Sequence, residues 1–453
     1  MKQFRNNKII SAICLLTLLI FIGIYKNNHV SALDRNIYKE IKVFNEILNI
    51  VEKNYVEQVE PQTLIQGAIE GMMKSLDPHS TFMTADMYQE LEVNTRGSFG
   101  GIGTEITILK DVLTVVAPIE DTPAFRAGIK AGDQIIKIDG KSTKDINIME
   151  AVKKLRGPKD TKVTLTIMRK SAAKPLEFII NRAIINIKSV KTKIYDDHIG
   201  YIRVASFQER TGDDLGKAVN DIQTKVKTLK GIVLDLRDNP GGLLTQAVDV
   251  SDAFLKSGLI VSIKGRAKNM HSEYSAKDDG YEPECPIIVL VNEGTASASE
   301  IVSGALQDNG RGIILGTKTF GKGSVQTVIP LEEGAALKLT TAKYYTPSGR
   351  SIQAEGINPD IIIRQVKNAY EEESPGSVLR EKDLEGHIKS TQKDDEETED
   401  LLKSESDELM SDNQLKSAID ILKSWEVFKK VTSAQNDKRS AHRNTPANSS
   451  SAI

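Results

Sequence analysis

The sequence predicts a multidomain α+β protein, and three observations support that class. From residue 199 onward, apolar strand-like runs alternate with helix-like runs, which is typical of a mixed sheet covered by helices. Residues 97–187 contain short apolar runs separated by turn residues, and residues 38–92 show the helical spacing of apolar side chains. At 453 residues the chain is long enough for two or three domains with buried cores.

The composition excludes several classes of function. The chain is 39% hydrophobic and 27% charged, and its formal net charge of −2 comes without any basic tract, so we expect no nucleic-acid binding. Its two cysteines, Cys14 and Cys285, form no disulfide framework and lack the spacing of a metal site. The sequence therefore predicts neither a metal nor a cofactor.

Residues 1–32 have the features of an export signal. Lys2, Arg5 and Lys8 precede the apolar run 9–25, and the small residues 30–32 offer a cleavage site. The apolar run lies at the lower limit for spanning a bilayer, so a cleaved signal peptide and an uncleaved membrane anchor both remain open. Either way we expect an extracytoplasmic protein, associated with the membrane through residues 9–25 if the leader is kept.

The two flanks of the globular part differ in character. Residues 33–96 are predicted to be a helical region, interrupted at Asp77-Pro78, where His79 reads as a turn residue rather than a catalytic one. Residues 368–410 form an acidic linker that we expect to be disordered, because it lacks large apolar side chains; a binding tail is the less favoured alternative. A short helix is predicted within 411–430, followed by a disordered tail over 431–453.

Residues 97–187 resemble a PDZ domain of the bacterial protease type. The resemblance rests on Thr122-Pro-Ala-Phe-Arg-Ala-Gly128, read as a short helix ending in glycine, and on the Gly-Asp turn and apolar strand of 131–140. Strands are expected at 104–108, 113–116, 134–138 and 163–168, and helices at 123–127 and 148–155. A PDZ domain holds the carboxylate of a peptide C-terminus with backbone N–H groups. Gly101, Ile102 and Gly103 are the positions that match this cradle; alternatively they only turn the chain.

Residues 188–367 carry the alternating strands and helices. We expect strands at 200–204, 231–236, 259–263, 287–291 and 313–315, and helices at 213–229, 244–255 and 300–307. Two further strands, 337–339 and 342–345, are expected to extend the same sheet. This region therefore predicts a mixed α/β core.

Ser297 is the candidate nucleophile of this core. It follows the apolar strand 287–291, precedes a helix and has small neighbours that leave room for a substrate. The same segment, Ser297-Ala-Ser-Glu300, also fits a helix capping box, so the serine could simply cap the helix. The segment by itself leaves the two interpretations equal.

Lys322 favours the catalytic interpretation. It lies between Gly321 and Gly323, a context that is unusual for a surface lysine, and burial can lower a lysine pKa by about 3–5 units so that the amine acts as a base. Gln326 lies four residues further and could orient that amine through a hydrogen bond. None of the six histidines has a triad context. The sequence therefore predicts a serine–lysine dyad.

An oxyanion hole is predicted at Leu234-Asp-Leu-Arg-Asp-Asn-Pro-Gly-Gly242. A buried strand ends here in a glycine turn with backbone N–H groups that can point at a ligand. We expect the N–H of Gly242, in preference to that of Gly241, to act together with the N–H of Ala298. A tight turn before the following helix is compatible with this role.

Together these segments resemble the carboxyl-terminal processing peptidases, or tail-specific proteases, over residues 40–365 and more weakly over 411–428. The matching motifs are 77–80, 237–242, 294–300, 319–326 and 344–353, and the family's serine, lysine and glutamine fall on Ser297, Lys322 and Gln326. The resemblance implies a ClpP/crotonase-like core with an inserted PDZ domain that gates access, an extracytoplasmic bacterial location and frequent dimerisation or higher oligomers. It also implies substrates with unstructured apolar C-termini, an activator or adaptor protein, and coupling of the PDZ domain to the core through Arg156. The alternative for Arg156 is a solvated cation at a helix end.

Two rival functions belong to other classes. A PDZ adaptor that has lost proteolytic activity would share the architecture, although the intact serine, lysine and glutamine argue against it. An acyl-CoA enzyme of the ClpP/crotonase-like type would share only the core, and the PDZ segment and the export signal disfavour it.

Overall fold

The computed structural model describes residues 35–196, 198–266, 270–366 and 412–425. The predicted leader (1–32), acidic linker (368–410) and tail (431–453) lie outside the described residues. Two compact units are distinguished, residues 1–73 and 74–453. In the first, the helix α2 (Arg35–Asn54) is followed by α3 (Pro61–Lys74). Within the described part of the chain, no helix is long and apolar enough to cross a bilayer.

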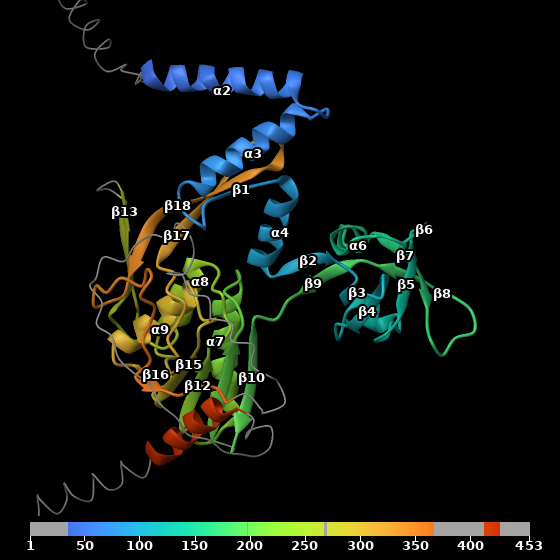
Figure 1. The fold of residues 1–453 in the computed structure, drawn as a ribbon. Helices are drawn as coiled ribbons and strands as arrows, with labels where there is room; N and C mark the ends of the chain where they lie inside the picture. The colour runs from blue at the N-terminus through green and yellow to red at the C-terminus, as the bar shows by residue number, and fades with distance from the viewer. Residues whose placement is uncertain (1–34, 197, 267–269, 367–411, 426–453) are drawn as a thin grey trace, which may run out of the picture. The chain divides into compact units, whose positions relative to one another are not determined.

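The second unit contains a six-stranded sheet, called the central sheet below, much of which can be followed in Figure 1. Its order is β10 (Val190–Tyr195), β11 (Ile199–Val204), β12 (Gly231–Asp235), β15 (Ile287–Val291), β16 (Gly312–Gly316) and β19 (Ile361–Ile362). The β10–β11 pair is antiparallel and the other neighbours are parallel. This mixed sheet, with the helices that connect it, confirms the predicted multidomain α+β class.

Helices cover both faces of this sheet, because side chains alternate between its faces. Ile287, Val289 and Val291 share a buried cluster with α7 (Thr211–Lys225), α8 (Leu244–Asp252) and α9 (Ala298–Asp308). The intervening Ile288 and Leu290 pack in a second cluster with Leu415, Ala418, Ile419 and Leu422, which belong to a helix over 413–425. Strands buried on both faces explain the continuous apolar runs in the sequence.

A second sheet corrects two expectations. It contains β1 (Thr81–Met83), β18 (Ala336–Tyr345), β13 (Leu259–Gly265) and β14 (His271–Ser275), with β17 (Ser324–Pro330) paired to β18. The prediction that the strands at 259–263, 337–339 and 342–345 belong to the central sheet is wrong, because they lie in this second sheet. The last two of them form one continuous strand, β18. The region 33–96 is not wholly helical, because β1 pairs with β18. Long-range pairing of this kind leaves no local pattern in the sequence.

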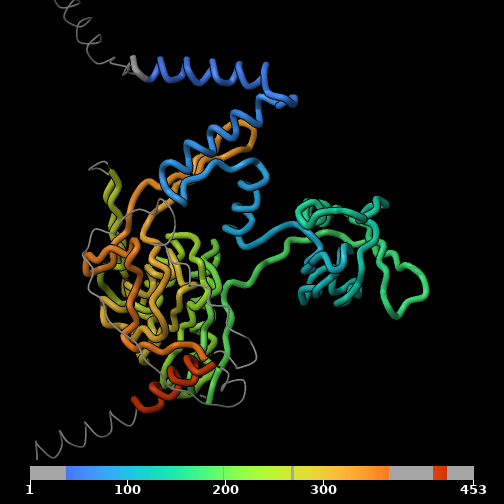
Figure 2. Tube along the Cα trace, in the orientation of Figure 1, coloured from blue at the N-terminus to red at the C-terminus, as the bar shows by residue number. Residues whose placement is uncertain are grey.

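The segment 97–187 forms a compact β-rich module with its own core. Its sheet contains β3 (Thr104–Leu109), β4 (Val112–Pro118), β5 (Gln134–Ile138), β7 (Lys162–Met168) and β8 (Leu176–Asn181), with β6 (Lys141–Ser142) beside β5. The helices α5 (Pro123–Arg126) and α6 (Ile148–Leu155) accompany this sheet, close to their predicted positions. The chain enters the module along β2 (Ser98–Gly101) and leaves it along β9 (Ala183–Asn186), and these two strands pair (Figure 2). The helix α4 (Ala85–Arg96) precedes β2, and a short 3₁₀ helix, η1 (Glu332–Gly334), lies between β17 and β18.

Candidate active site

One cavity of about 910 Å³ collects the predicted catalytic residues. Ser297 lies at the start of α9, Lys322 in the loop before β17 and Gln326 on β17, and all three line this cavity. The glycine turn after β12 reaches the same cavity, together with residues of α4 such as Tyr88, Leu91 and Glu92. Segments that are far apart in the sequence therefore meet around the candidate nucleophile.

Ser297 has an unusual backbone conformation. It occupies the turn between β15 and α9 with φ 60° and ψ −116°, a region that residues with a side chain rarely adopt. Such strain persists only where the surrounding structure imposes it, and it is concentrated at functional sites. The predicted capping box between Ser297 and Glu300 is present, but the serine lacks the extended backbone that Thr122 and Asn147 have at the starts of α5 and α6.

Glu300 links the serine segment to the lysine segment. This side chain is fully buried, and its Oε2 accepts the N–H groups of Ser297 at 2.8 Å and Lys322 at 2.9 Å. Its Oε1 accepts the Gly321 N–H at 2.8 Å and the Thr319 hydroxyl at 2.5 Å. One carboxylate thus sets the position of the candidate nucleophile relative to the backbone of the candidate base.

The environment of Glu300 also changes its proton affinity. Burial raises the pKa of this carboxyl to about 7, although the hydrogen bonds from Thr319, Ser297, Gly321 and Lys322 act in the opposite direction. The four donors can all be accepted only by an ionised carboxylate, because protonation converts one oxygen into a donor. Protonation of Glu300 would therefore remove part of the contact that aligns the two segments.

The glycine turn after β12 distinguishes the two oxyanion candidates. The N–H of Gly241 donates to Asn239 Oδ1 at 2.9 Å, so that donor is already used. Among the hydrogen bonds of the described residues, the N–H groups of Gly242 and Ala298 donate none. A Cβ added to Gly241 would lie 3.0 Å from the Ala298 nitrogen, which shows how closely the turn approaches the start of α9. This arrangement supports Gly242 over Gly241.

Gln326 is held in place through β18. Its Nε2 donates to Ser324 Oγ at 2.9 Å and to Thr340 Oγ1 at 3.4 Å. The Thr340 hydroxyl in turn donates to Asp77 Oδ1 at 3.1 Å. Burial would raise the pKa of Asp77, but hydrogen bonds from Ser80, His79 and Thr340 outweigh it and hold the pKa below its usual value. The Asp77-Pro-His-Ser80 turn therefore supports the strand pair that carries Gln326.

A separate small pocket of about 80 Å³ lies in the β-rich module. Gly101, Ile102 and Gly103 line it, as do Phe99 and Arg156. The guanidinium carbon of Arg156 lies 4.6 Å from the centre of the Phe99 ring, and its Nη1 is 2.5 Å from Glu90 Oε2 on α4. The residue predicted to couple the two regions thus contacts both the pocket and the helix that lines the larger cavity.

Sequence reasoning missed the main role of Glu300 and of Thr319. Glu300 was recognised only as a member of a capping box, and Thr319 only as part of a motif. The available signal was an acidic side chain within an otherwise apolar helix start, since such a charge needs buried partners. No histidine among the described residues lines the large cavity.

Comparisons with known proteins identify the family. Residues 198–363 match the model of peptidase family S41, residues 114–169 that of a PDZ domain, and residues 24–87 that of the activating protease CtpB N-terminal domain. A carboxy-terminal-processing protease of Bartonella bacilliformis is 51% identical over 365 residues, which are 80% of this chain and 83% of the relative. The chain belongs to the carboxy-terminal processing proteases of peptidase family S41. It is therefore a serine-type peptidase with a PDZ domain.

Two further relatives have the same character. The carboxy-terminal processing protease CtpA of Bacillus subtilis is 37% identical over 318 residues, covering 70% of this chain and 67% of the relative. A probable CtpA-like serine protease of Staphylococcus aureus is 37% identical over 367 residues, covering 80% of this chain and 73% of the relative. The predicted family resemblance is thus confirmed over most of the chain.

Proposed function

We propose that this protein is an exported serine endopeptidase that uses a Ser297–Lys322 dyad and selects substrates by their apolar C-terminal tails. The observation that carries the proposal is the convergence of Ser297, Lys322 and Gln326 on one cavity, beside the donors of Gly242 and Ala298. A nucleophile, a base, an orienting amide and an oxyanion site are the parts that acyl transfer needs.

In the proposed reaction, Ser297 Oγ attacks the carbonyl carbon of the substrate and its proton passes to neutral Lys322 Nζ. The oxygen of the tetrahedral intermediate is stabilised by the N–H groups of Gly242 and Ala298 and by the N-terminus of α9. The resulting ammonium donates its proton to the departing amine, and water then releases the acyl group from the serine. Gln326 is proposed to accept a hydrogen bond from the amine through its amide oxygen and so to orient it.

The PDZ pocket is proposed to bind the C-terminus of the substrate. Gly101, Ile102 and Gly103 would supply N–H groups for the terminal carboxylate, and the apolar lining suits an unstructured apolar tail. Arg156 is proposed to transmit occupancy of this pocket, because its ion pair with Glu90 reaches α4, and Leu91 and Glu92 of α4 line the catalytic cavity.

Further features of the proposal lie outside the catalytic cavity. Residues 1–32 are proposed to direct export to the bacterial periplasm or cell envelope, either cleaved or kept as an anchor. The apolar side chains that α2 exposes, among them Ile37, Ile41 and Ile47, support a homodimer or higher oligomer. We also propose that residues 33–96, 97–187 and 188–367 are the N-terminal region, the PDZ domain and the protease core.

The experiment that tests the dyad uses an unfolded casein-like protein as substrate. Ser297→Ala and Lys322→Ala should each lower the rate of hydrolysis by at least about 10³-fold, because they remove the proposed nucleophile and base. Lys322→Arg should have the same effect, because a guanidinium cannot accept the serine proton at neutral pH. Ser303→Ala on α9 and Lys318→Arg in the lysine segment serve as matched controls, since neither residue lines the cavity. Substantial activity in any of the first three variants would show that the nucleophile or the base is misassigned. A wild-type protein that binds tailed peptides without cleaving them would instead favour the inactive adaptor.

A further inference from the structure

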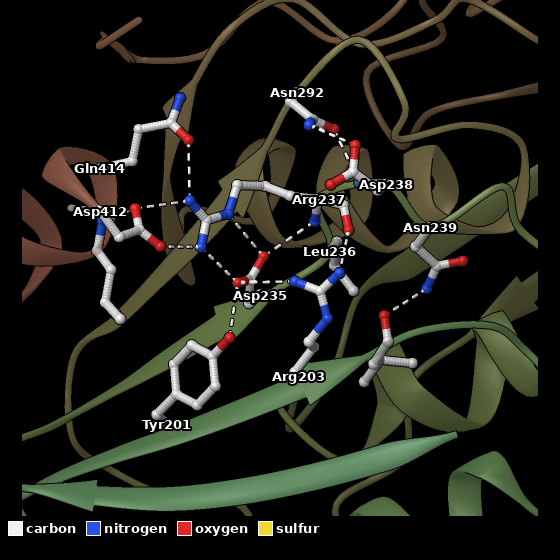
Figure 3. Close-up of polar contacts among 12 residues, drawn as sticks. Tyr201, Arg203, Asp235, Leu236, Arg237, Asp238, Asn239, Asn292, Asp412 and Gln414 are labelled. Carbon is white, nitrogen blue, oxygen red and sulfur yellow. Dashed lines mark hydrogen bonds and ion pairs between the residues drawn. The ribbon is translucent and has the colours of Figure 1, made fainter. Parts of the chain in front are cut away.

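A buried arginine fixes the point at which the chain leaves β12 and enters the glycine turn. Arg237 is 5% exposed, and its Nε and its backbone N–H both lie 3.0 Å from Asp235 Oδ1, while its Nη2 lies 2.7 Å from Asp235 Oδ2 (Figure 3). The side chain of Arg237 thereby holds its own backbone against the end of the strand. Tyr201 and Arg203 complete the surroundings of Asp235 through bonds of 2.8 and 3.4 Å.

Three of the five N–H donors of this guanidinium depend on the C-terminal segment. Nη1 donates to Asp412 Oδ1 at 2.8 Å and to Gln414 Oε1 at 3.0 Å, and Nη2 donates to Asp412 Oδ2 at 2.7 Å (Figure 3). Only the two remaining donors are satisfied by Asp235. A buried guanidinium needs all five partners, so the segment from Asp412 completes the surroundings of Arg237.

The C-terminal segment is itself firmly attached to the core. Leu415, Ile419 and Leu422 are buried in the cluster that covers one face of the central sheet. Gln414 Nε2 donates to the Ile363 carbonyl at 2.7 Å, and Asp412 Oδ1 accepts the Leu415 N–H at 3.0 Å as the helix cap. Loss of the Asp412 charge alone would therefore leave the helix docked by its apolar face.

The residues after Arg237 lead directly to the proposed oxyanion site. Asp238 exchanges two hydrogen bonds with Asn292, at 2.9 and 2.8 Å, and the Asn239 carbonyl accepts the Ala296 N–H at 3.0 Å. Asn239 Oδ1 holds the Gly241 N–H, which leaves the next N–H, that of Gly242, as the donor. The turn thus connects Arg237 to Gly242 through residues that bond to the segment before Ser297.

We propose that Arg237 is a positioning residue for the oxyanion turn and that the C-terminal segment, through Asp412 and Gln414, completes the active site in cis. This inference rests on the proposed function, because it assumes that Gly242 stabilises the transition state. The segment beginning at Asp412 is then part of the catalytic apparatus, although it touches neither the substrate nor the reacting atoms.

The experiment compares Asp412→Asn with the wild type in the full chain. The amide keeps the size of the side chain but loses the charge and one acceptor, so kcat should fall about tenfold with KM changed less than twofold. The inhibition constant of a peptide aldehyde, whose hemiacetal oxygen would occupy the oxyanion site, should rise in parallel. Binding of the same substrate peptide to Ser297→Ala and to the Ser297→Ala/Asp412→Asn double variant should be equal. Asp412→Glu, which restores the carboxylate, should recover part of the loss.

The matched control is Lys423→Gln, which breaks an exposed ion pair of 2.7 Å between the same helix and Asp196. This variant should keep wild-type kcat. The inference is overturned if the kcat of Asp412→Asn stays within twofold of the wild type. It is also overturned if the loss of kcat is fully explained by the fraction of unfolded protein that the lowered melting temperature implies. Should Asp412→Asn not accumulate as folded protein, Gln414→Met decides: a lower kcat at constant KM supports the inference, and a wild-type kcat overturns it. A wild-type chain without Ser297-dependent hydrolysis would instead refute the proposed function.

Discussion

The catalytic cavity and the PDZ pocket are held in place by different kinds of contact. Around the cavity, the fully buried Glu300 accepts four hydrogen bonds from the serine and lysine segments. The PDZ pocket is linked to α4 by two ion pairs, Arg156–Glu90 and Lys153–Asp86, whose side chains are 28–60% exposed. Buried charged hydrogen bonds are costly to break, whereas exposed ion pairs contribute about 0–1 kcal/mol. The hydrogen bonds around the candidate catalytic cavity should therefore resist disruption more than the ion pairs that join the PDZ module to α4.

The largest loss of kcat should come from a substitution at Gly242, beside the catalytic cavity. A Cβ at this position would lie 2.2 Å from the Phe207 carbonyl oxygen, and the φ of +145° already disfavours a side chain. Gly242→Ala should therefore displace the proposed oxyanion donor and lower kcat by about 10²–10³-fold in a peptide hydrolysis assay. Gly216→Ala is the control, because its Cβ meets nothing within 4 Å and alanine suits the interior of α7. Equal activity of the two variants would contradict the assignment of Gly242.

A smaller loss of kcat is expected from Glu300→Gln, and the pH dependence of activity tests the same buried carboxylate. The amide nitrogen of glutamine carries N–H donors that would face the backbone N–H groups of Ser297 or Lys322, which leaves buried donors without an acceptor. We therefore expect kcat to fall about tenfold or more. In the wild type, activity should decline as the pH falls through about 7, because protonated Glu300 cannot accept all four bonds.

Stability should show the opposite dependence on pH. The folded pKa of Glu300 is raised above its unfolded value, so the folded state binds the additional proton. The contribution of this group to the free energy of unfolding should therefore grow as the pH falls from about 7 towards 4.5, and the Gln variant should lack that contribution. Parallel denaturant titrations of both proteins over this range measure it. Identical pH profiles for the two proteins would contradict the role of Glu300.

The smallest change in turnover is expected at the Arg156–Glu90 ion pair between the PDZ module and α4. Arg156→Ala removes the pair with Glu90 and the contact with the Phe99 ring, and should change turnover of substrates with an apolar C-terminal tail only a few-fold, as expected for a partly exposed ion pair. Turnover of the same peptide with an amidated C-terminus should not change. Lys153→Ala, which breaks the neighbouring pair on α6, is the matched control. Unaltered turnover of the tailed substrate in Arg156→Ala would remove the coupling role.

The sequence by itself determined the class of fold and several elements of the PDZ module, although not its strand β8, and it suggested the candidate site residues. Short apolar runs, the Gly-Asp turn and the glycines around Lys322 are local patterns, because they express conformational needs of a few neighbouring residues. At Ser297 the sequence predicted a turn between a strand and a helix, but not the strained backbone of the serine.

Only the tertiary structure decided how these parts meet. It separated β13 and β18 from the central sheet, favoured Gly242 over Gly241 by using the Gly241 N–H elsewhere, and turned Glu300 into the link between two segments. Arg237 and Asp412 are 175 positions apart, and Thr340 and Asp77 are 263 apart. Partners at such separations leave no periodic signal, because burial and hydrogen bonding select them only after the chain has folded.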